Sequence, residues 1–148
     1  MKGQLRHDPA WLDAFFQRAD EIFVSFSGGD YPYVLPLNFV WLDGRIYLHC
    51  GFTGRKLDLL RQDGRVGFAA ALDVTIVRER STTWYKSVSG CGHIRIVEDT
   101  EEKRRALDAL SLRYAARCPR PAPEAMLRRV NVLCIDVENI SGKERTPS

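Results

Sequence analysis

The segment Gly54-Arg55-Lys56 has the residue types that bind phosphate groups. The glycine precedes a short helix predicted over 55–61, because the apolar residues there recur at helical spacing. The first N–H groups of a helix lack partners within it and carry partial positive charge, so two neighbouring cations would complement an anion. The alternative is that Arg55 and Lys56 belong to a solvated face and that Gly54 only makes the turn. The motif alone leaves both interpretations open.

His49 lies just before this turn, at the end of a strand predicted to begin at Arg45. Alternation along a strand places His49 on the same face as Tyr47 and on the face opposite Cys50. A histidine in this place can hydrogen-bond a phosphate or a substrate, and its charge can change near neutral pH. The alternative is a histidine whose ring is satisfied by a backbone carbonyl.

A metal site would need several of the available ligand types to converge. His49, Cys50, Cys91 and His93 are such types, but His49 and Cys50 point to opposite faces of one strand, so we expect no metal. The sequence has no P-loop, serine-hydrolase elbow, H-E-x-x-H helix or G-x-G-x-x-G turn. No acid pair stands out either, so an enzyme of this sequence would borrow its reactive group from a cofactor.

A strand predicted over 33–42 contains Pro36, which removes one hydrogen-bond donor from the sheet. Pro36 shares a strand face with Asn38. Unpaired backbone beside an amide side chain could read the edge of a heterocycle that alternates donors and acceptors. A simple barrel corner explains Pro36 equally well.

A long strand predicted over 84–97 could also face a ligand. Ser87 and Ser89 line one of its faces. Trp84 could stack on an aromatic ring, although buried aromatic residues more often belong to a core.

Length and composition favour one ordinary globular domain over residues 1–148. With 45% hydrophobic and 28% charged residues, the chain is not disordered, collagenous or a coiled coil. The net charge of +3 is too small and dispersed to predict nucleic-acid binding, and no window approaches the ~20 apolar residues of a membrane span. Four cysteines without a C-x-x-C pair suit buried thiols in a reducing compartment, so we expect a cytoplasmic protein.

The order of the predicted elements favours a mostly β fold. Asp43-Gly44 is a strong hairpin turn, because both positions need positive φ. Hairpin-linked strands without intervening helices favour an antiparallel barrel with helices packed outside over a doubly wound parallel sheet. The predicted strands are 22–26, 33–42, 45–50, 66–77, 84–97 and 130–137, and the helices are 9–19, 55–61 and 99–117.

Several ordered segments resemble the FMN-binding split-barrel proteins related to pyridoxamine 5′-phosphate oxidase, and within them the nitroimidazole-resistance (Nim-type) branch. The resemblance covers about residues 1–143 in order and spacing. The segments are YPYVLPLNF (31–39), DGRIYLH (43–49), GRKLDLL (54–60), YKSV (85–88) and ISGK (140–143).

The resemblance implies a six-stranded antiparallel split β-barrel that forms a homodimer, with one FMN in each of two clefts at the subunit interface. It implies that Arg55 and Lys56 bind the FMN phosphate, helped by His49 and Ser87. His49 is also the catalytic candidate, because Nim-type proteins resemble one another in placing a histidine near the bound small molecule. The remaining implied flavin contacts are Pro36, Leu37, Asn38 and Phe39 along the ring, with Trp84 and Val88 flanking the site.

The first functional hypothesis is an FMN-dependent oxidoreductase, for example a nitroreductase, that passes electrons from NADH or NADPH to a small molecule. The second is a binding protein that holds flavin, haem or a deazaflavin without turnover. An oligonucleotide-binding barrel is disfavoured, because acidic residues interrupt the basic ones. Vitamin B6 oxidation is not expected, because the sequence lacks the C-terminal extension specific to that activity.

Overall fold

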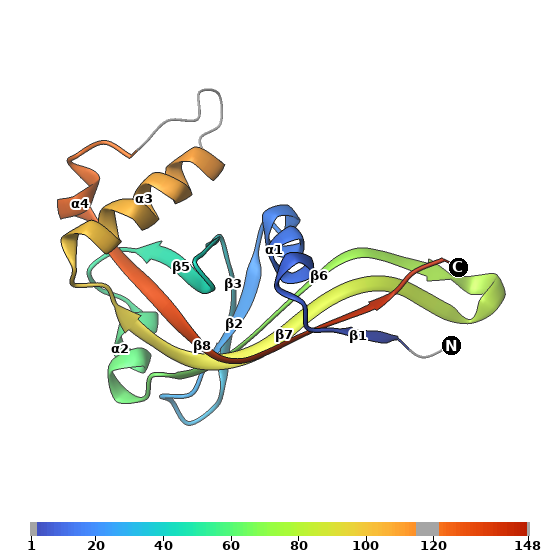
Figure 1. Cartoon of the computed structure of the whole chain (residues 1–148). Helices are drawn as coiled ribbons and strands as arrows, with labels where there is room; N and C mark the ends of the chain where they lie inside the picture. Colours follow the sequence, from blue (N-terminus) through green and yellow to red (C-terminus); the bar gives the residue numbers. More distant parts are fainter. Residues whose placement is uncertain (1–2, 115–121, 148) are drawn as a thin grey trace.

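The computed structural model describes residues 3–114 and 122–147, and the strands in these ranges form one antiparallel sheet (Figure 1). The strands pair in the order β3-β2-β6-β7-β8-β5-β4, and β1 pairs with β8. Their bounds are β1 Gln4–Arg6, β2 Ile22–Phe26, β3 Tyr33–Leu37, β4 Val40–Leu42, β5 Arg45–Cys50, β6 Arg65–Val77, β7 Thr82–Ile96 and β8 Asn131–Arg145.

The two end strands of this pairing order, β3 and β4, are separated in sequence only by Asn38 and Phe39. So short a connection requires the sheet to curl until its two edges approach each other. β3 and β4 do not pair with each other, so the barrel is split between them. The expected mostly β, antiparallel split barrel with flanking helices is therefore confirmed.

The sheet has eight described strands where the sequence predicted six. The predicted strand 33–42 divides at Asn38 and Phe39, because the Phe39 N–H donates to the Tyr114 hydroxyl (3.2 Å) and not to a neighbouring strand. Gln4–Arg6 adds the other strand by pairing with β8. Three residues are too few for an alternating pattern to be recognised in a sequence.

β8 runs to Arg145, well beyond its predicted end at Val137. The register between β7 and β8 shifts where Cys91 opposes Asn139 and Gly92 opposes Val137, which leaves Glu138 as an extra residue. Such a bulge breaks the alternation of apolar and polar residues on which the prediction depended.

β6 and β7 form a long hairpin closed by the short helix η1 (Arg78–Arg80), at the break predicted there. Its outer half, together with β1 and the end of β8, projects beyond the barrel, and we call this projection the arm (Figure 1). A register shift between Leu72 and Thr75 marks its base. There Asp73 accepts two hydrogen bonds from Arg18 of the first helix, at 2.7 and 2.8 Å.

In the described ranges, four α-helices flank the sheet: α1 Pro9–Arg18, α2 Arg55–Gln62, α3 Thr100–Tyr114 and α4 Met126–Arg129. The predicted end of the third helix, near residue 117, lies outside the described residues. No helix in the described ranges is long and apolar enough to span a membrane.

Buried apolar residues form two clusters on the two faces of β5. Ile46 and Leu48 face the barrel interior, with residues of α1, α2, β2 and β6. Tyr47 faces the other way and packs with Ala106 and Leu107 of α3. α3 therefore covers the outer face of β5, and Figure 1 shows α2 and α3 on either side of this strand.

Charged side chains fasten the start of α3 to the sheet. Arg95 of β7 donates to both carboxylate oxygens of Glu102 (3.1 and 2.9 Å) and to Asp136 of β8 (2.7 Å). The Tyr47 hydroxyl donates to Glu102 at 2.7 Å. Arg95 holds the pKa of Glu102 and of Asp136 below the usual range, and burial together with the Glu102 carboxylate raises the pKa of Tyr47.

Candidate functional site

The end of β5 has a hollow on each of its two faces. One, which we call the cradle pocket, has a volume of about 150 Å³ and lies at the start of α2. The other, the roofed pocket, has a volume of about 260 Å³ and lies beneath α3. Cys50 lines the first and His49 the second, as expected for adjacent residues of a strand. The cradle pocket is completed by Tyr33, Leu35, Gly51, Thr53, Gly54, Arg55, Lys56 and Leu57, and the roofed pocket by Asn38, Leu107, Leu110, Ser111, Tyr114, Ala122, Pro123 and Met126.

α2 begins in the cradle pocket without a side chain to cap its first N–H groups. Gly54 occupies the capping position with φ of 143°, a conformation that favours glycine, and it offers no side-chain acceptor. The other two long helices are capped: Asp8 accepts from the Trp11 N–H (2.7 Å) and Asp99 from the Glu102 N–H (2.8 Å). An anion in the cradle pocket could satisfy the N–H groups of α2 as these aspartates do elsewhere.

The charges around this helix start are also suited to an anion. Arg55 and Lys56 both line the pocket, and the Arg55 guanidinium lies over the Tyr33 ring, 4.7 Å from its centroid. Among the described residues that line this pocket, none is acidic, and Asp58 of the same helix turn is exposed outside it. Burial raises the pKa of the Cys50 thiol, so this pocket contains a neutral thiol at neutral pH.

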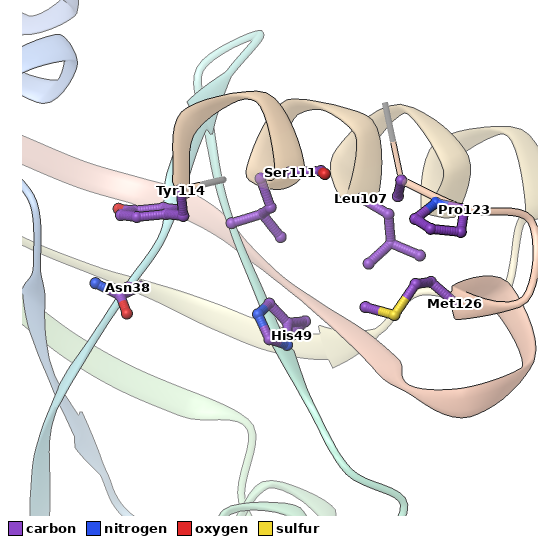
Figure 2. Close-up of a pocket in the computed structure, with 9 residues that line it drawn as sticks. Asn38, His49, Leu107, Ser111, Tyr114, Pro123 and Met126 are labelled. Carbon is purple, nitrogen blue, oxygen red and sulfur yellow. The ribbon is translucent and has the colours of Figure 1, made fainter. Parts of the chain in front are cut away.

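In the roofed pocket, backbone carbonyls fix the orientation of the polar groups of Asn38 and Tyr114. Asn38 Nδ2 donates to the Asp20 carbonyl at 3.0 Å. The Tyr114 hydroxyl accepts from the Phe39 N–H and lies 2.8 Å from the carbonyl oxygens of both Asp20 and Phe39. The bond from Asn38 Nδ2 fixes the amide so that, in Figure 2, Oδ1 lies on the side of His49 and Nδ2 on the far side.

Figure 2 shows the His49 ring pointing from β5 toward α3, between Asn38 on one side and Met126 on the other. The side chain is exposed, and no hydrogen bond within the described part of the chain engages its ring. The alternative interpretation, in which a backbone carbonyl satisfies the His49 ring, is therefore not observed in the described residues. His49 is free to bind a ligand.

β3 connects the two pockets. Leu35 lines the cradle pocket, and Asn38 lines the roofed pocket three residues later, a distance of about 10 Å along a strand. Between them, Pro36 is exposed on the outer face of the sheet, and Leu37 is half-buried toward the core. Phe39 is fully buried, edge-on to Phe16. The side chain of Phe39 therefore belongs to the core, and only its backbone borders the site.

The predicted residues of β7 line neither pocket in one chain. Val88 is 1% exposed and packs in the barrel core. Ser87 is half-buried beside Ala71, on the outer face of the sheet. Trp84 lies on the arm, and its indole N–H is buried without a partner among the described residues. An unpaired buried donor costs about 1–3 kcal/mol, so the arm gains stability if a ligand or another chain supplies an acceptor.

Sequence reasoning missed several lining residues of the roofed pocket. Leu107, Ser111 and Tyr114 are four and three residues apart, so they share one face of a helix. Helical spacing indicates that these residues share a face, but it does not indicate that this face roofs a cavity above His49. No group of three or more metal-binding side chains converges within 3–114 and 122–147.

Comparison with solved structures finds the same fold in several proteins. A proposed 5-nitroimidazole antibiotic resistance protein from Bacteroides thetaiotaomicron is 28% identical with a TM-score of 0.82, over 96% of this chain and 87% of that one. An FAD and heme binding protein from Mycobacterium smegmatis is 18% identical with a TM-score of 0.79, over 97% and 74%. An FAD-binding protein from Mesorhizobium loti is 19% identical with a TM-score of 0.69, over 99% and 100%.

Sequence comparison gives a family. No curated protein matches the chain. A family model described as pyridoxamine 5′-phosphate oxidase matches residues 8–144, which is nearly the whole sequence. The split barrel, the resemblance of the ordered segments and this match agree, and the chain belongs to the pyridoxamine 5′-phosphate oxidase family.

Proposed function

We propose that this protein binds a flavin, that the flavin is FMN, and that the cradle pocket holds its phosphate. The observation that carries the proposal is the uncapped start of α2, whose first two residues are Arg55 and Lys56, in a pocket whose described lining residues include no acid. A phosphate dianion would accept from the free N–H groups and pair with both cations. A solvated face would not require the pocket or the uncapped helix.

The isoalloxazine ring is proposed to lie along β3 between the two pockets. The backbone from Pro36 to Phe39 offers polar groups to the edge of a ring there. His49 borders the roofed pocket, where it can hydrogen-bond a small substrate or hold a proton.

A bound flavin supplies two-electron redox chemistry that no side chain of the protein provides. The protein is accordingly proposed to be an FMN-dependent oxidoreductase that uses NADH or NADPH and reduces a small molecule. The named resistance protein from Bacteroides thetaiotaomicron makes nitroaromatic compounds the first substrates to assay.

A second copy of the chain is proposed to complete the site. On the outer face of the sheet, Pro36, Phe23, Ala69 and Ser89 follow one another in register across four strands. Phe23 is 47% exposed, and Val34 in the next row is 55% exposed. An apolar sheet face without a covering helix is typical of a subunit interface. Such an interface could bring Ser87 and Trp84 of one protomer to the flavin of its partner.

FAD is a second candidate for the flavin, because two of the structurally similar proteins are named for binding it. FAD and FMN share the ring and the phosphate next to the ribityl chain. The two proposals differ in which flavin the purified protein contains, and chromatography after denaturation distinguishes them.

Comparison of FMN with riboflavin tests the cradle directly, because riboflavin has the same ring without a phosphate. Flavin-free protein is titrated with each compound, and binding is followed by quenching of flavin fluorescence. We expect FMN to bind at least about tenfold more tightly, as a charge-assisted phosphate contact predicts. Equal affinities would overturn the phosphate assignment, and absence of binding by FMN, FAD and riboflavin would overturn the proposed function.

A further inference from the structure

We propose that the roofed pocket is a binding site for a small uncharged molecule, with an apolar ring held by α3 and α4 and an N–H donor directed at Asn38 Oδ1. The inference rests on the proposed function for one point, that this molecule is the substrate of a neighbouring flavin. The binding site itself is argued from the lining residues.

The apolar side of the pocket comes from α3 and from the segment that leads into α4. Leu107 and Leu110 belong to α3, and Ala122, Pro123 and Met126 belong to the segment that leads into α4. Figure 2 shows Met126 facing Leu107. Leu107 is 2% exposed and Leu110 is 3% exposed, so both are fixed by the packing around them. A flat apolar ring between these groups would exchange contact with water for contact with carbon and sulfur.

The polar groups of Asn38 and Tyr114 lie on one side of the pocket, and hydrogen bonds fix their orientation. The bond from Asn38 Nδ2 to the Asp20 carbonyl turns Nδ2 away from His49 and presents Oδ1 to the pocket. The Tyr114 hydroxyl is already engaged by the backbone of Phe39 and Asp20. A ligand that donates an N–H to Asn38 is therefore favoured over one that presents only acceptors there.

Charge further restricts the ligand. None of the nine described residues that line the pocket is Lys, Arg, Asp or Glu. A charged molecule would lose its hydration on entering and would meet no opposite charge among these lining residues. His49 is the lining residue that could attract an anion if its ring carried a proton. Binding of a carboxylate probe tests for this attraction.

The volume of the roofed pocket limits the size of its ligand. The volume of about 260 Å³ lies below the roughly 300–1,000 Å³ of pockets that take drug-sized ligands. A single ring with one substituent fits this limit, whereas a dinucleotide does not.

Benzamide and benzoate are matched probes for these properties. Both have one ring and nearly the same shape, but benzamide is neutral and donates N–H, whereas benzoate is an anion without a donor. The purified full-length protein, saturated with FMN, is titrated with each probe and followed by ligand-observed NMR. We expect the Kd of benzamide to be at least about tenfold lower than that of benzoate.

Two neighbouring residues of α3 provide a variant and its control. Ser111→Phe fills the pocket from its roof, whereas Leu112→Phe adds a similar ring at a position that is 49% exposed and outside the pocket. Ser111→Phe should raise the Kd of benzamide at least about tenfold, and Leu112→Phe should change it less than about twofold. Met126→Trp fills the pocket from the opposite wall and should also raise the Kd of benzamide at least about tenfold. Agreement between the two variants would exclude an effect confined to α3.

Flavin affinity, measured on the same proteins, separates the two proposals. Retained FMN binding in both pocket-filling variants, with loss of benzamide, supports a substrate site beside the flavin. Loss of FMN binding in Ser111→Phe but not in Leu112→Phe would overturn the inference, because the pocket would then hold the flavin itself. Equal affinity for benzoate, or unchanged benzamide binding in the filled variants, would overturn it as well. A wild-type protein that binds benzamide but no flavin would overturn the proposed function and leave the binding site standing.

Discussion

At the scale of single residues, the proposed site depends on groups without hydrogen-bond or ion-pair partners among the described residues. Arg55 and Lys56 are the first two residues of an uncapped helix, and Asn38 presents one free oxygen to the roofed pocket. Arg55 and Lys56 could be recognised from the sequence, because they directly follow Gly54. The orientation of Asn38 could not, because it depends on the carbonyl of Asp20, which the fold brings close from another segment.

Replacement of Lys56 by alanine tests the cradle. Lys56→Ala removes one charge-assisted contact with the phosphate, so FMN should bind about tenfold to a hundredfold more weakly, while riboflavin affinity stays nearly constant. Fluorescence titration measures both. Arg105→Ala, which removes an exposed cation of α3 outside the cradle pocket, is the control and should have little effect. Equal weakening of riboflavin would place Lys56 outside the phosphate site.

At the scale of elements, α3 is the part that makes a pocket from an open sheet face. Its start is held by Glu102 on Arg95, and its end by Tyr114 on the connection between β3 and β4. The sequence predicted α3, β5 and the hairpin at Asp43 from local patterns. It did not predict the division of 33–42, because the partner of the Phe39 N–H is a side chain far along the chain.

Removal of the Tyr114 hydroxyl should weaken this attachment. Tyr114→Phe leaves the Phe39 N–H without its acceptor, and the free energy of unfolding should fall by about 1–3 kcal/mol. Denaturant unfolding measures the change. Tyr31→Phe is the control, since Tyr31 is 83% exposed and forms no hydrogen bond through its side chain within the described residues, and it should be neutral. A neutral Tyr114→Phe would mean that the hydroxyl does not fasten α3.

The ion pairs at the start of α3 predict a pH dependence. Arg95 lowers the pKa of Glu102 and Asp136 in the folded protein below the values of the unfolded chain. The stabilisation of the folded state by these two carboxylates is therefore complete above about pH 5. It is lost as the pH falls through their lowered pKa values in the folded protein. Glu102→Gln should make the loss of unfolding free energy below pH 5 shallower, whereas Glu101→Gln, an exposed neighbour, should not. Identical pH profiles for the two variants would contradict this account.

At the scale of the whole molecule, one chain leaves the outer sheet face and the arm uncovered. Phe23 and Val34 are exposed on that face, and the indole N–H of Trp84 has no partner on the arm within the described ranges. Local patterns predicted the antiparallel barrel and its helices. They could not place Ser87 or Trp84 relative to the cradle pocket, because that relation involves a second copy in the proposed dimer.

A charge on the outer face should separate the protomers. Phe23→Glu would bury an unpaired carboxylate in the proposed interface, so the variant should be monomeric by light scattering and should lose flavin as it dissociates. Leu112→Glu, at a similarly exposed position on α3, should remain dimeric. A monomeric Phe23→Glu protein that keeps its flavin would exclude a site shared between protomers.

The absorption spectrum of the purified protein tests the central claim most directly, combined with chromatography of whatever a denaturant releases. We predict a yellow protein with flavin absorption, which releases FMN in about one equivalent per chain and recovers its colour when FMN is returned. Released FAD would keep the flavin proposal and correct its identity. A colourless protein that takes up neither FMN nor FAD would contradict the account.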